Sequence, residues 1–430
     1  MAQVVRNDLR QFLAPANGQT ENVRHEIDAI LAAVRDHLGM EIAFASRFVE
    51  GRREFTHIQA TVPVPASPGD SEPLEETLCQ RILEGRLPAL MHDAQDHEAA
   101  LEMTLTRALP IGAHLNVPIR FRDGRIYGTF CCLSRSADRS LTERDLMTVK
   151  AFAQLASDQI ERDLEQDERR DQIRHRIKAI LGGTSLGMVY QPIHSLEDGR
   201  VRGLESLARF PAVKGVSDCP SDWFAAAAEV GLGQDLELHA IRHALAILPT
   251  LPSDIYLSIN ASPETAVSGR LDPLLAGLPR ERLVIEITEH SEVTDYALLE
   301  EALNRLRPLA RIAIDDVGAG YAGLRHIVDL HPDLLKLDMS LTRHVDSDPA
   351  RGALAQAMVD FAGRIGCAIV AEGVETAEEA DTLRGFGVGY VQGYLYNRPA
   401  PAVVIQQLLL DHRPLPTRSP ARRPGRRAAA

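Results

Sequence analysis

The sequence has few cysteines, few aromatic residues and no surplus of positive charge. Its five cysteines include no CxxC pair, which predicts a reduced, cytoplasmic protein without a disulfide framework. The net charge of −13 argues against binding to nucleic-acid polymers or membrane surfaces, because both require basic residues to neutralise phosphates. It does not exclude one small anionic substrate held by metal ions.

Long apolar runs are also missing. No stretch approaches the roughly 20 apolar residues of a membrane-spanning helix. The N-terminal "MAQVVRNDLRQFLAPANG" lacks the apolar centre of a signal peptide. We therefore expect no membrane partner. The chain is long, however, and 430 residues with 45% hydrophobic content predict two or three globular domains.

Two stretches have the patterns of folded domains. After an N-terminal extension (1–20), residues 21–140 combine an amphipathic helix with strand-like runs, and the Asp-Gly of "FRDGRIYG" predicts a hairpin. This predicts a small α+β domain. Residues 183–411 alternate eight short apolar runs with helical stretches, which predicts an α/β fold of the (β/α)8 TIM-like barrel type. The Pro- and Arg-rich tail (412–430) is expected to be disordered.

Residues 141–182 predict one long connecting helix. Its apolar positions alternate at spacings of three and four residues, which is typical of a helical seam. They are Leu146, Val149, Ala153, Ala156 and Ile160, and then Ile173, Ile177 and Ile180. A helix that pairs with a second copy fits this pattern, so we expect a homodimer. For the charged middle, a solvated helix packed on its own domain is an equally good interpretation.

Polar residues recur near the ends of the predicted barrel strands, where such barrels place their chemistry. They are Gln191, Glu205, Arg209, Asn260, Glu286, Asp315, Asp316, Lys336, Asp338, Glu372 and Gln392. A lone strand-end carboxylate often only caps the next helix. Five of these carboxylates and an amide, converging on one pocket, cannot all stay as they are without cations, because the carboxylates would not all remain ionised. Oxygen-only ligands suit Mg²⁺ or Mn²⁺, and two such ions about 3.5–4 Å apart are used for displacement at phosphorus.

Eight motifs then resemble a known family. "YQPI", "ESLARF", "NAS", "EITE", "DDVGAGYAGL", "LKLD", "AEGVE" and "QGYLYNRP" occur in the order and spacing of EAL domains. These bacterial phosphodiesterases linearise cyclic di-GMP to pGpG. The stretches "LCQRILEGRLPALMHDA" and "YGTFCCLSR" make the first domain similar to a GAF sensor domain. The resemblance implies a cyclic di-GMP phosphodiesterase that is regulated by a GAF domain of unknown ligand.

The resemblance also implies a role for each matched residue. The implied metal ligands are Glu205, Asn260, Glu286, Asp315, Asp316 and Glu372, with Asp315 in the bridging position. The implied catalytic group is Lys336, Glu372, Glu375 and Gln392, in which Lys336 helps to activate water and Glu375 supports Lys336 indirectly, from behind the groups that contact it. The implied substrate contacts are Gln191, Leu207, Arg209 and Asp338, and Glu289 would anchor the loop "VGAGYAGLRHI".

Two departures from the family pattern bear on activity. The namesake motif has Glu-Ser-Leu for Glu-Ala-Leu, where we expect little effect. In the loop after the fifth strand Val317 replaces an aromatic residue, and Ala322 and Gly323 replace serines. Val buries less apolar area than Phe, which reduces the free energy of burial by about 1–2 kcal/mol. The loop is therefore expected to be held less firmly.

Two other functions are alternatives to an active cyclic di-GMP phosphodiesterase. One is a degenerate domain that binds cyclic di-GMP or a protein without turnover, and the other is a metallohydrolase for another phosphodiester. The retained ligands and lysine favour activity.

Overall fold

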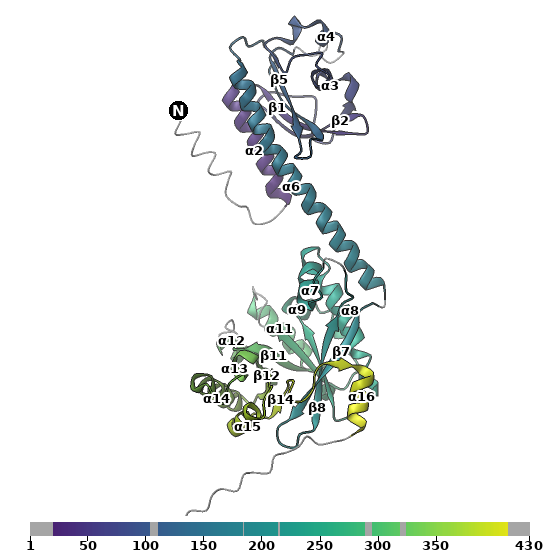
Figure 1. The fold of residues 1–430 in the computed structure, drawn as a ribbon, viewed down its shortest axis with the longest axis vertical. Helices are drawn as coiled ribbons and strands as arrows, with labels where there is room; N and C mark the ends of the chain where they lie inside the picture. Colours follow the sequence, from purple (N-terminus) through teal and green to yellow (C-terminus); the bar gives the residue numbers. More distant parts are fainter. Residues whose placement is uncertain are drawn as a thin grey trace, which may run out of the picture. The chain divides into compact units, whose positions relative to one another are not determined.

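The computed structural model describes residues 20–103, 111–183, 185–213, 216–288, 295–318 and 324–411 (Figure 1). The chain divides into two compact units between Arg169 and Arg170. The expected disordered tail and nearly all of the expected N-terminal extension lie outside the described residues. Within the described ranges, none of the helices combines the length and the apolar character that crossing a membrane requires.

The first unit is built on an antiparallel sheet with the order β3-β2-β1-β6-β5-β4 in the part described. Its strands are β1 (Ile42–Val49), β2 (Arg52–Ala60), β3 (Ser71–Pro73), β4 (Leu90–Met91), β5 (His114–Arg120) and β6 (Ile126–Leu133). The expected hairpin is confirmed, because β5 and β6 pair on either side of Asp123 and Gly124. Gly124 has a φ of 87°, which glycine adopts without strain.

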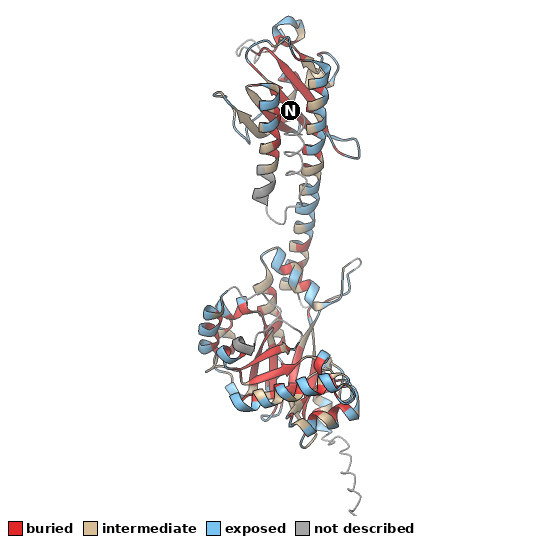
Figure 2. Ribbon diagram, turned by 90° about the vertical axis from the view of Figure 1, so that its left-hand side faces the viewer, coloured by how far each residue is buried: buried red, intermediate tan, exposed pale blue. Residues whose placement is uncertain are grey.

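Different elements cover the two faces of this sheet. The helix α2 (Thr20–Leu38) and the start of α6 (Glu143–Gly182) lie side by side against one face and complete an apolar core (Figures 1 and 2). The other face carries a small cluster that includes Phe44, Cys79 and Cys131, where Cys79 comes from the short helix α3 (Leu78–Leu83). A further short helix, α4 (Glu98–Leu101), belongs to the same unit.

The apolar stripe of α6 is used inside this chain. Leu146, Val149 and Ile160 are buried in the core of the first unit. Ile173 and Ile177 pack in the second unit against a cluster that contains Trp223. The expectation that this stripe forms a seam with a second copy is therefore wrong. A spacing of three and four residues produces one apolar stripe whether it faces its own sheet or another helix. The homodimer stays a prediction without this support.

We expect Val149→Asp to unfold the first unit, not to dissociate a dimer. Val149 is fully buried beneath the sheet, and an unpaired carboxylate there lowers the free energy of unfolding by about 3 kcal/mol or more. Urea denaturation followed by circular dichroism measures this loss. Met147→Asp is the matched control, because Met147 is 58% exposed on the same helix. A Val149→Asp chain with normal stability but a lower sedimentation coefficient would instead support the interpretation of the stripe as a dimer seam.

The second unit is a closed barrel, as expected. Its described strands have the order β14-β13-β12-β11-β10-β9-β8-β7, and β14 also pairs with β7. The strands are β7 (Gly187–Ser195), β8 (Val201–Arg209), β9 (Tyr256–Ala261), β10 (Leu283–Thr288), β11 (Arg311–Val317), β12 (Leu334–Leu337), β13 (Ala368–Ala371) and β14 (Tyr390–Val391). A short β15 (Ala400–Pro401) pairs with the other side of β7.

Helices surround this barrel and leave their outer faces exposed (Figure 2). They are α7 (Pro220–Glu229), α8 (Gly233–Leu245), α9 (Pro263–Val267), α10 (Asp272–Leu275), α11 (Tyr296–Leu306), α12 (Leu324–Leu330), α13 (Met339–Thr342), α14 (Pro349–Ile365), α15 (Ala377–Phe386) and α16 (Ala402–Leu410). The strands are buried on both sides, as strands of a barrel enclosed by helices must be.

The barrel is TIM-like, but its strands are not all parallel. β7 runs antiparallel to both β8 and β14. The physical reason is the link between β7 and β8, which consists only of residues 196–200. A tight turn can join antiparallel strands, whereas a parallel pair needs a crossover of about a dozen residues. The remaining neighbours from β8 to β14 are parallel.

Candidate active site

The interior of the barrel changes from apolar to charged over a single layer of side chains. The apolar layer consists of Ile193, Tyr256, Val284, Ala313, Leu334 and Val370. Because alternate residues of a strand face the same side, the next layer holds the residues two positions along the chain. These residues include Glu286, Asp315 and Lys336 on three strands and Glu372 directly after β13. Gly203 supports the apolar layer, since a Cβ there would lie 2.3 Å from the Tyr256 ring.

Lys336 lies at the centre of the charged layer with only 1% of its surface exposed. Its Nζ lies 2.7 Å from Glu372, 2.8 Å from Glu286, 3.1 Å from Asp315 and 3.4 Å from Glu205. Burial by itself lowers the pKa of Lys336, but the carboxylates outweigh it and hold the pKa well above its usual range. Lys336 is therefore a buried cation with more negative partners than it can neutralise.

The carboxylates show this excess of negative charge. Burial raises the pKa of Glu286 to about 8, even though the Lys336 ammonium opposes the shift. Burial also raises the pKa of Glu372 well above its usual range. Ser258 donates a hydrogen bond to Glu286. Taking a carboxylate out of water disfavours its ionised form unless positive charge compensates, so the described site favours binding of a further cation.

The carboxylates form two groups of three, and Asp315 belongs to both. In the described residues, Glu205, Glu286 and Asp315 offer oxygens that all lie within 4.8 Å of one another. Asp315, Asp316 and Glu372 form the second group, with the same limit on distance. The site thus contains one carboxylate that could contact two ions, together with oxygen ligands for each.

Asp316 reaches this site through an unusual backbone conformation. Consecutive residues of a strand normally point to opposite faces. Asp316 has a φ of 58°, in the left-handed region, and the register between β11 and β12 shifts between Ile314 and Val317. The Asp316 backbone N–H donates to Asp315 Oδ1 at 2.9 Å. The irregular strand end therefore brings two neighbouring carboxylates to one place.

We expect Asp316→Ala to lower stability by about 1 kcal/mol more than Asp316→Asn, because asparagine tolerates the left-handed conformation and alanine does not. Both changes remove the same carboxylate charge, so the loss of charge does not contribute to their difference. Chemical denaturation without added metal measures it. Equal stabilities would mean that this position is not left-handed in solution.

Two buried glutamines position one of the carboxylates. Gln392 Nε2 donates to Glu205 and, at 3.0 Å, to Gln191 Oε1. Gln191 Nε2 donates in turn to the Asn397 carbonyl at 3.1 Å. Gln392 Oε1 is buried and has no hydrogen-bond partner among the described residues. Its free acceptor is available to a group that enters the site.

A cavity of about 430 Å³ lies among α7, α8 and the ends of β8 and β9. Leu207, Arg209 and Asn260 line it, together with Phe224 and Glu237. Arg209 is exposed and donates to the Ala208 carbonyl. The structure therefore places three of the expected residues on one cavity wall. Asp338 accepts a hydrogen bond from Ser340 N at 2.8 Å and caps α13.

Comparison with known proteins agrees with this architecture. The EAL domain family matches residues 171–399, which is more than half of the chain, and the GAF domain family matches residues 22–160. The chain belongs to the EAL family. Its first unit is a GAF domain and its second an EAL barrel.

Relatives and solved structures share parts of this EAL chain. The probable cyclic di-GMP phosphodiesterase PdeG of Escherichia coli is 32% identical over 52% of this chain and 46% of PdeG. The cyclic di-GMP phosphodiesterase PA2567 of Pseudomonas aeruginosa is 32% identical over 50% of this chain and 39% of its own. The structure of the EAL enzyme Bd1971 has a TM-score of 0.52 at 19% identity, over 86% of this chain and 93% of that chain, and supports the fold. The chain thus spans less than half the length of these two curated relatives.

One expected residue of the EAL site, Glu375, makes its described contact outside the charged layer. Glu375 forms an ion pair with Arg343 and is not among the four direct partners of Lys336, so its expected indirect role toward Lys336 stays a prediction. After Gly373 the chain turns away from the barrel to begin α15, and Glu375 follows that turn. Glu289, Ala322 and Gly323 lie outside the described residues, whereas Val317 is buried in the main core.

The sequence reasoning missed three residues that support the site. Ser258 contacts Glu286, and Asn397 accepts from Gln191 through its carbonyl. His194 Nε2 lies 3.0 Å from Asn397 Oδ1. Ser258 could have been found, because it comes two residues before Asn260 and therefore faces the same side of β9. The roles of Asn397 and His194 depend on closure of the barrel, which brings distant segments together.

Proposed function

We propose that the EAL barrel hydrolyses cyclic di-GMP to linear pGpG with the help of two divalent ions, Mg²⁺ or Mn²⁺, under control of the GAF domain. The observation that carries this proposal is the pair of carboxylate groups that share Asp315 beside Lys336. The names of the relatives PdeG and PA2567 support the substrate. The reaction is a displacement at phosphorus with water as the nucleophile.

The residues present fit divalent metal ions. Glu205, Glu286 and Asp315 would hold one ion, and Asp315, Asp316 and Glu372 the other. Asn260 is an additional candidate ligand through its amide oxygen. Hard oxygen ligands of this kind are preferred by Mg²⁺ and Mn²⁺, and burial raises the pKa of Glu286 despite Lys336, so a further cation beside it would favour its ionised form. When bound, such ions activate water and offset the charge that develops on phosphate oxygens.

The chain's own groups prepare this site. Lys336 holds four carboxylates in place and puts a permanent positive charge where the reacting phosphate would lie. Gln392 orients Glu205 and leaves one acceptor free for the nucleophile or phosphate. In the neighbouring cavity, the Arg209 guanidinium suits a phosphate and Leu207 offers an apolar contact to a base.

Incubation of the full chain with cyclic di-GMP in Mg²⁺, Mn²⁺ or Ca²⁺ tests the proposal, with products separated by chromatography. We expect pGpG in Mg²⁺ or Mn²⁺, and binding without turnover in Ca²⁺. Binding without turnover in every metal would favour a receptor for cyclic di-GMP. If cyclic di-GMP is neither bound nor hydrolysed, the result would favour another phosphodiester as the substrate. The turnover rate of residues 170–430 alone, compared with that of the full chain, tests control by the GAF domain.

A further inference from the structure

Two cysteines meet on the face of the GAF sheet opposite to the packed helices. Cys79 comes from α3 and Cys131 from β6, and their Sγ atoms lie 3.8 Å apart. Both side chains are buried. The next residue, Cys132, points to the other side of the sheet and belongs to the core beneath α2 and α6. Sequence adjacency therefore does not make Cys132 part of the pair, because neighbouring residues in a strand face opposite ways.

The surroundings of the two sulfurs are different. Arg53 Nη1 lies 3.2 Å from Cys79 Sγ, and Thr129 Oγ1 donates to the same sulfur at 3.3 Å. The hydrogen bond from Cys131 and the Arg53 guanidinium hold the pKa of Cys79 well below its usual range, against the effect of burial. Burial raises the pKa of Cys131. A thiolate beside a thiol is the arrangement from which disulfide chemistry starts.

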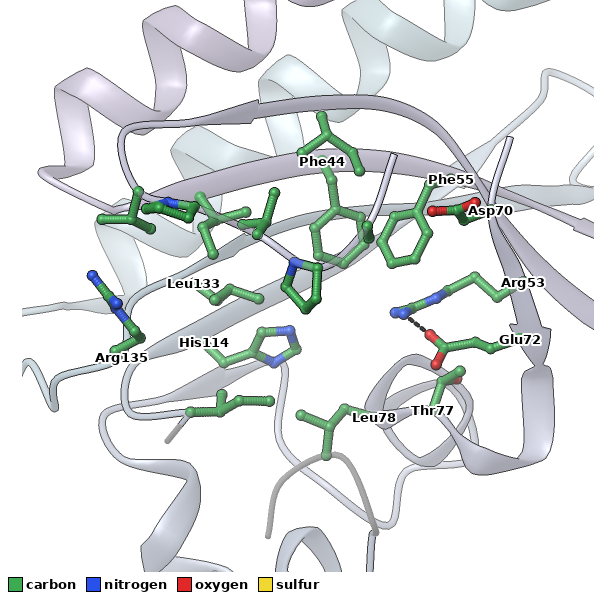
Figure 3. A pocket seen from close by; sticks show the side chains of 18 of the residues that line it. Phe44, Arg53, Phe55, Asp70, Glu72, Thr77, Leu78, His114, Leu133 and Arg135 are labelled. Carbon is green, nitrogen blue, oxygen red and sulfur yellow. Dashed lines mark hydrogen bonds and ion pairs between the residues drawn. The ribbon is translucent and has the colours of Figure 1, made fainter. Parts of the chain in front are cut away.

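A cavity of about 440 Å³ adjoins this pair. Arg53, Thr77, Leu78 and His114 line it, and Figure 3 shows them around one space. Thr77 and Leu78 come immediately before Cys79 in the chain, and Arg53 touches both the cavity and the Cys79 sulfur. Arg53 is itself fixed by an ion pair with Glu72 and by the Phe55 ring, 4.5 Å from its guanidinium carbon. A small solute in the cavity can therefore contact Arg53, which itself contacts the Cys79 sulfur.

We propose that Cys79 and Cys131 are a redox-active dithiol, which closes to a disulfide when a peroxide enters through this cavity. The Cys79 thiolate attacks one peroxide oxygen, the O–O bond breaks, and the departing hydroxide takes up a proton to become water. Cys131 then attacks the sulfenic sulfur of Cys79, the S–O bond breaks, and a second water leaves with the Cys131 proton. Two thiols and one hydrogen peroxide become one disulfide and two waters.

The required movement is small, and it has a defined consequence. The sulfurs must approach from 3.8 Å to the bond length of about 2 Å. The bond ties α3 to β6. Since Thr77 and Leu78 lead into α3 and line the cavity, the redox state of the pair would alter the shape of that cavity. This inference does not depend on the activity proposed for the barrel.

Peptide mapping of the full chain tests the proposal. The reduced protein is treated with hydrogen peroxide, free thiols are alkylated in denaturant, and the chain is digested with trypsin without reductant. Cleavage after arginine places Cys79 in the peptide 54–81 and both Cys131 and Cys132 in the peptide 126–135. We expect these peptides to be joined in the monomer fraction and to separate on reduction. Cys219 is exposed, and its oxidation reports that the peroxide dose was sufficient.

Single substitutions assign the bond. Cys132→Ser should keep the link between the peptides, and Cys131→Ser and Cys79→Ser should abolish it. Separate peptides in a sample whose Cys219 is oxidised would overturn the proposal, and this result needs only the unmodified chain. A link that survives in Cys131→Ser, or one found only in a covalent dimer, would overturn it as well.

Discussion

Replacing Lys336 by methionine is expected to lower turnover of cyclic di-GMP by roughly 100-fold or more at saturating Mg²⁺, because a fixed charge at the reacting phosphate acts mainly in the transition state. Methionine keeps most of the buried volume but leaves four carboxylates without their ammonium. The metal-free protein should therefore unfold at a lower temperature. Added Mg²⁺ should raise its melting temperature more than that of the wild type.

The two effects separate a catalytic lysine from a simple counter-ion. If Lys336 only balances charge, saturating Mg²⁺ should replace it and restore the wild-type rate. Substrate binding measured by calorimetry in Ca²⁺ should change by only a few fold, and loss of binding in parallel with rate would make Lys336 a substrate anchor. Lys178→Met is the matched control, since Lys178 is exposed on α6 and should tolerate the same exchange.

The second large effect is expected for Glu205→Gln, which should abolish measurable turnover while leaving the metal-free barrel as stable as before or more so. Glu205 belongs to one carboxylate group and is the most distant of the four partners of Lys336, at 3.4 Å. The amide oxygen of glutamine can still accept from Gln392. Removing one buried negative charge relieves repulsion, but it also removes a metal ligand, and turnover depends on the metal.

Turnover assays, thermal unfolding without metal and titration with Mn²⁺ measure the three consequences. Glu264→Gln serves as the control, because Glu264 is an exposed residue of α9. Near-wild-type rates at saturating Mg²⁺ would show that Glu205 is not a ligand. A large loss of stability with unchanged metal affinity would show that its carboxylate is structural.

The charged layer of the barrel could be predicted because it follows from strand periodicity. Glu286 and Lys336 each come near the end of an apolar run, and parallel strands carry such residues to the same rim. The partners of Lys336 could not be predicted in the same way. They come from three strands and from the residue that follows β13, and only the closed barrel shows that all of them lie within 3.4 Å of one ammonium.

The direction of a strand and the contact partner of a side chain or apolar face could not be predicted from local sequence patterns. The run "GMVYQPIHS" has the same pattern in either direction, and only the short link after it indicates that β7 is antiparallel. The stripe on α6 is compatible with a second copy, yet its own sheet covers it. Glu375 matches a motif position, but the turn at Gly373 carries it to Arg343. In each case a local pattern defines a face or a position without defining what lies opposite.

The pairing of β7 with β14 also has a consequence for the synthesis of the protein. β7 is the first strand of the barrel to leave the ribosome, and its final neighbours, β14 and β15, are among the last. Gln191 and Gln392, which meet across this closure, are 201 residues apart. Until then the growing sheet exposes unpaired strand edges, which favour aggregation. The GAF domain can fold early, whereas the barrel must wait for almost the whole chain before its active site can form.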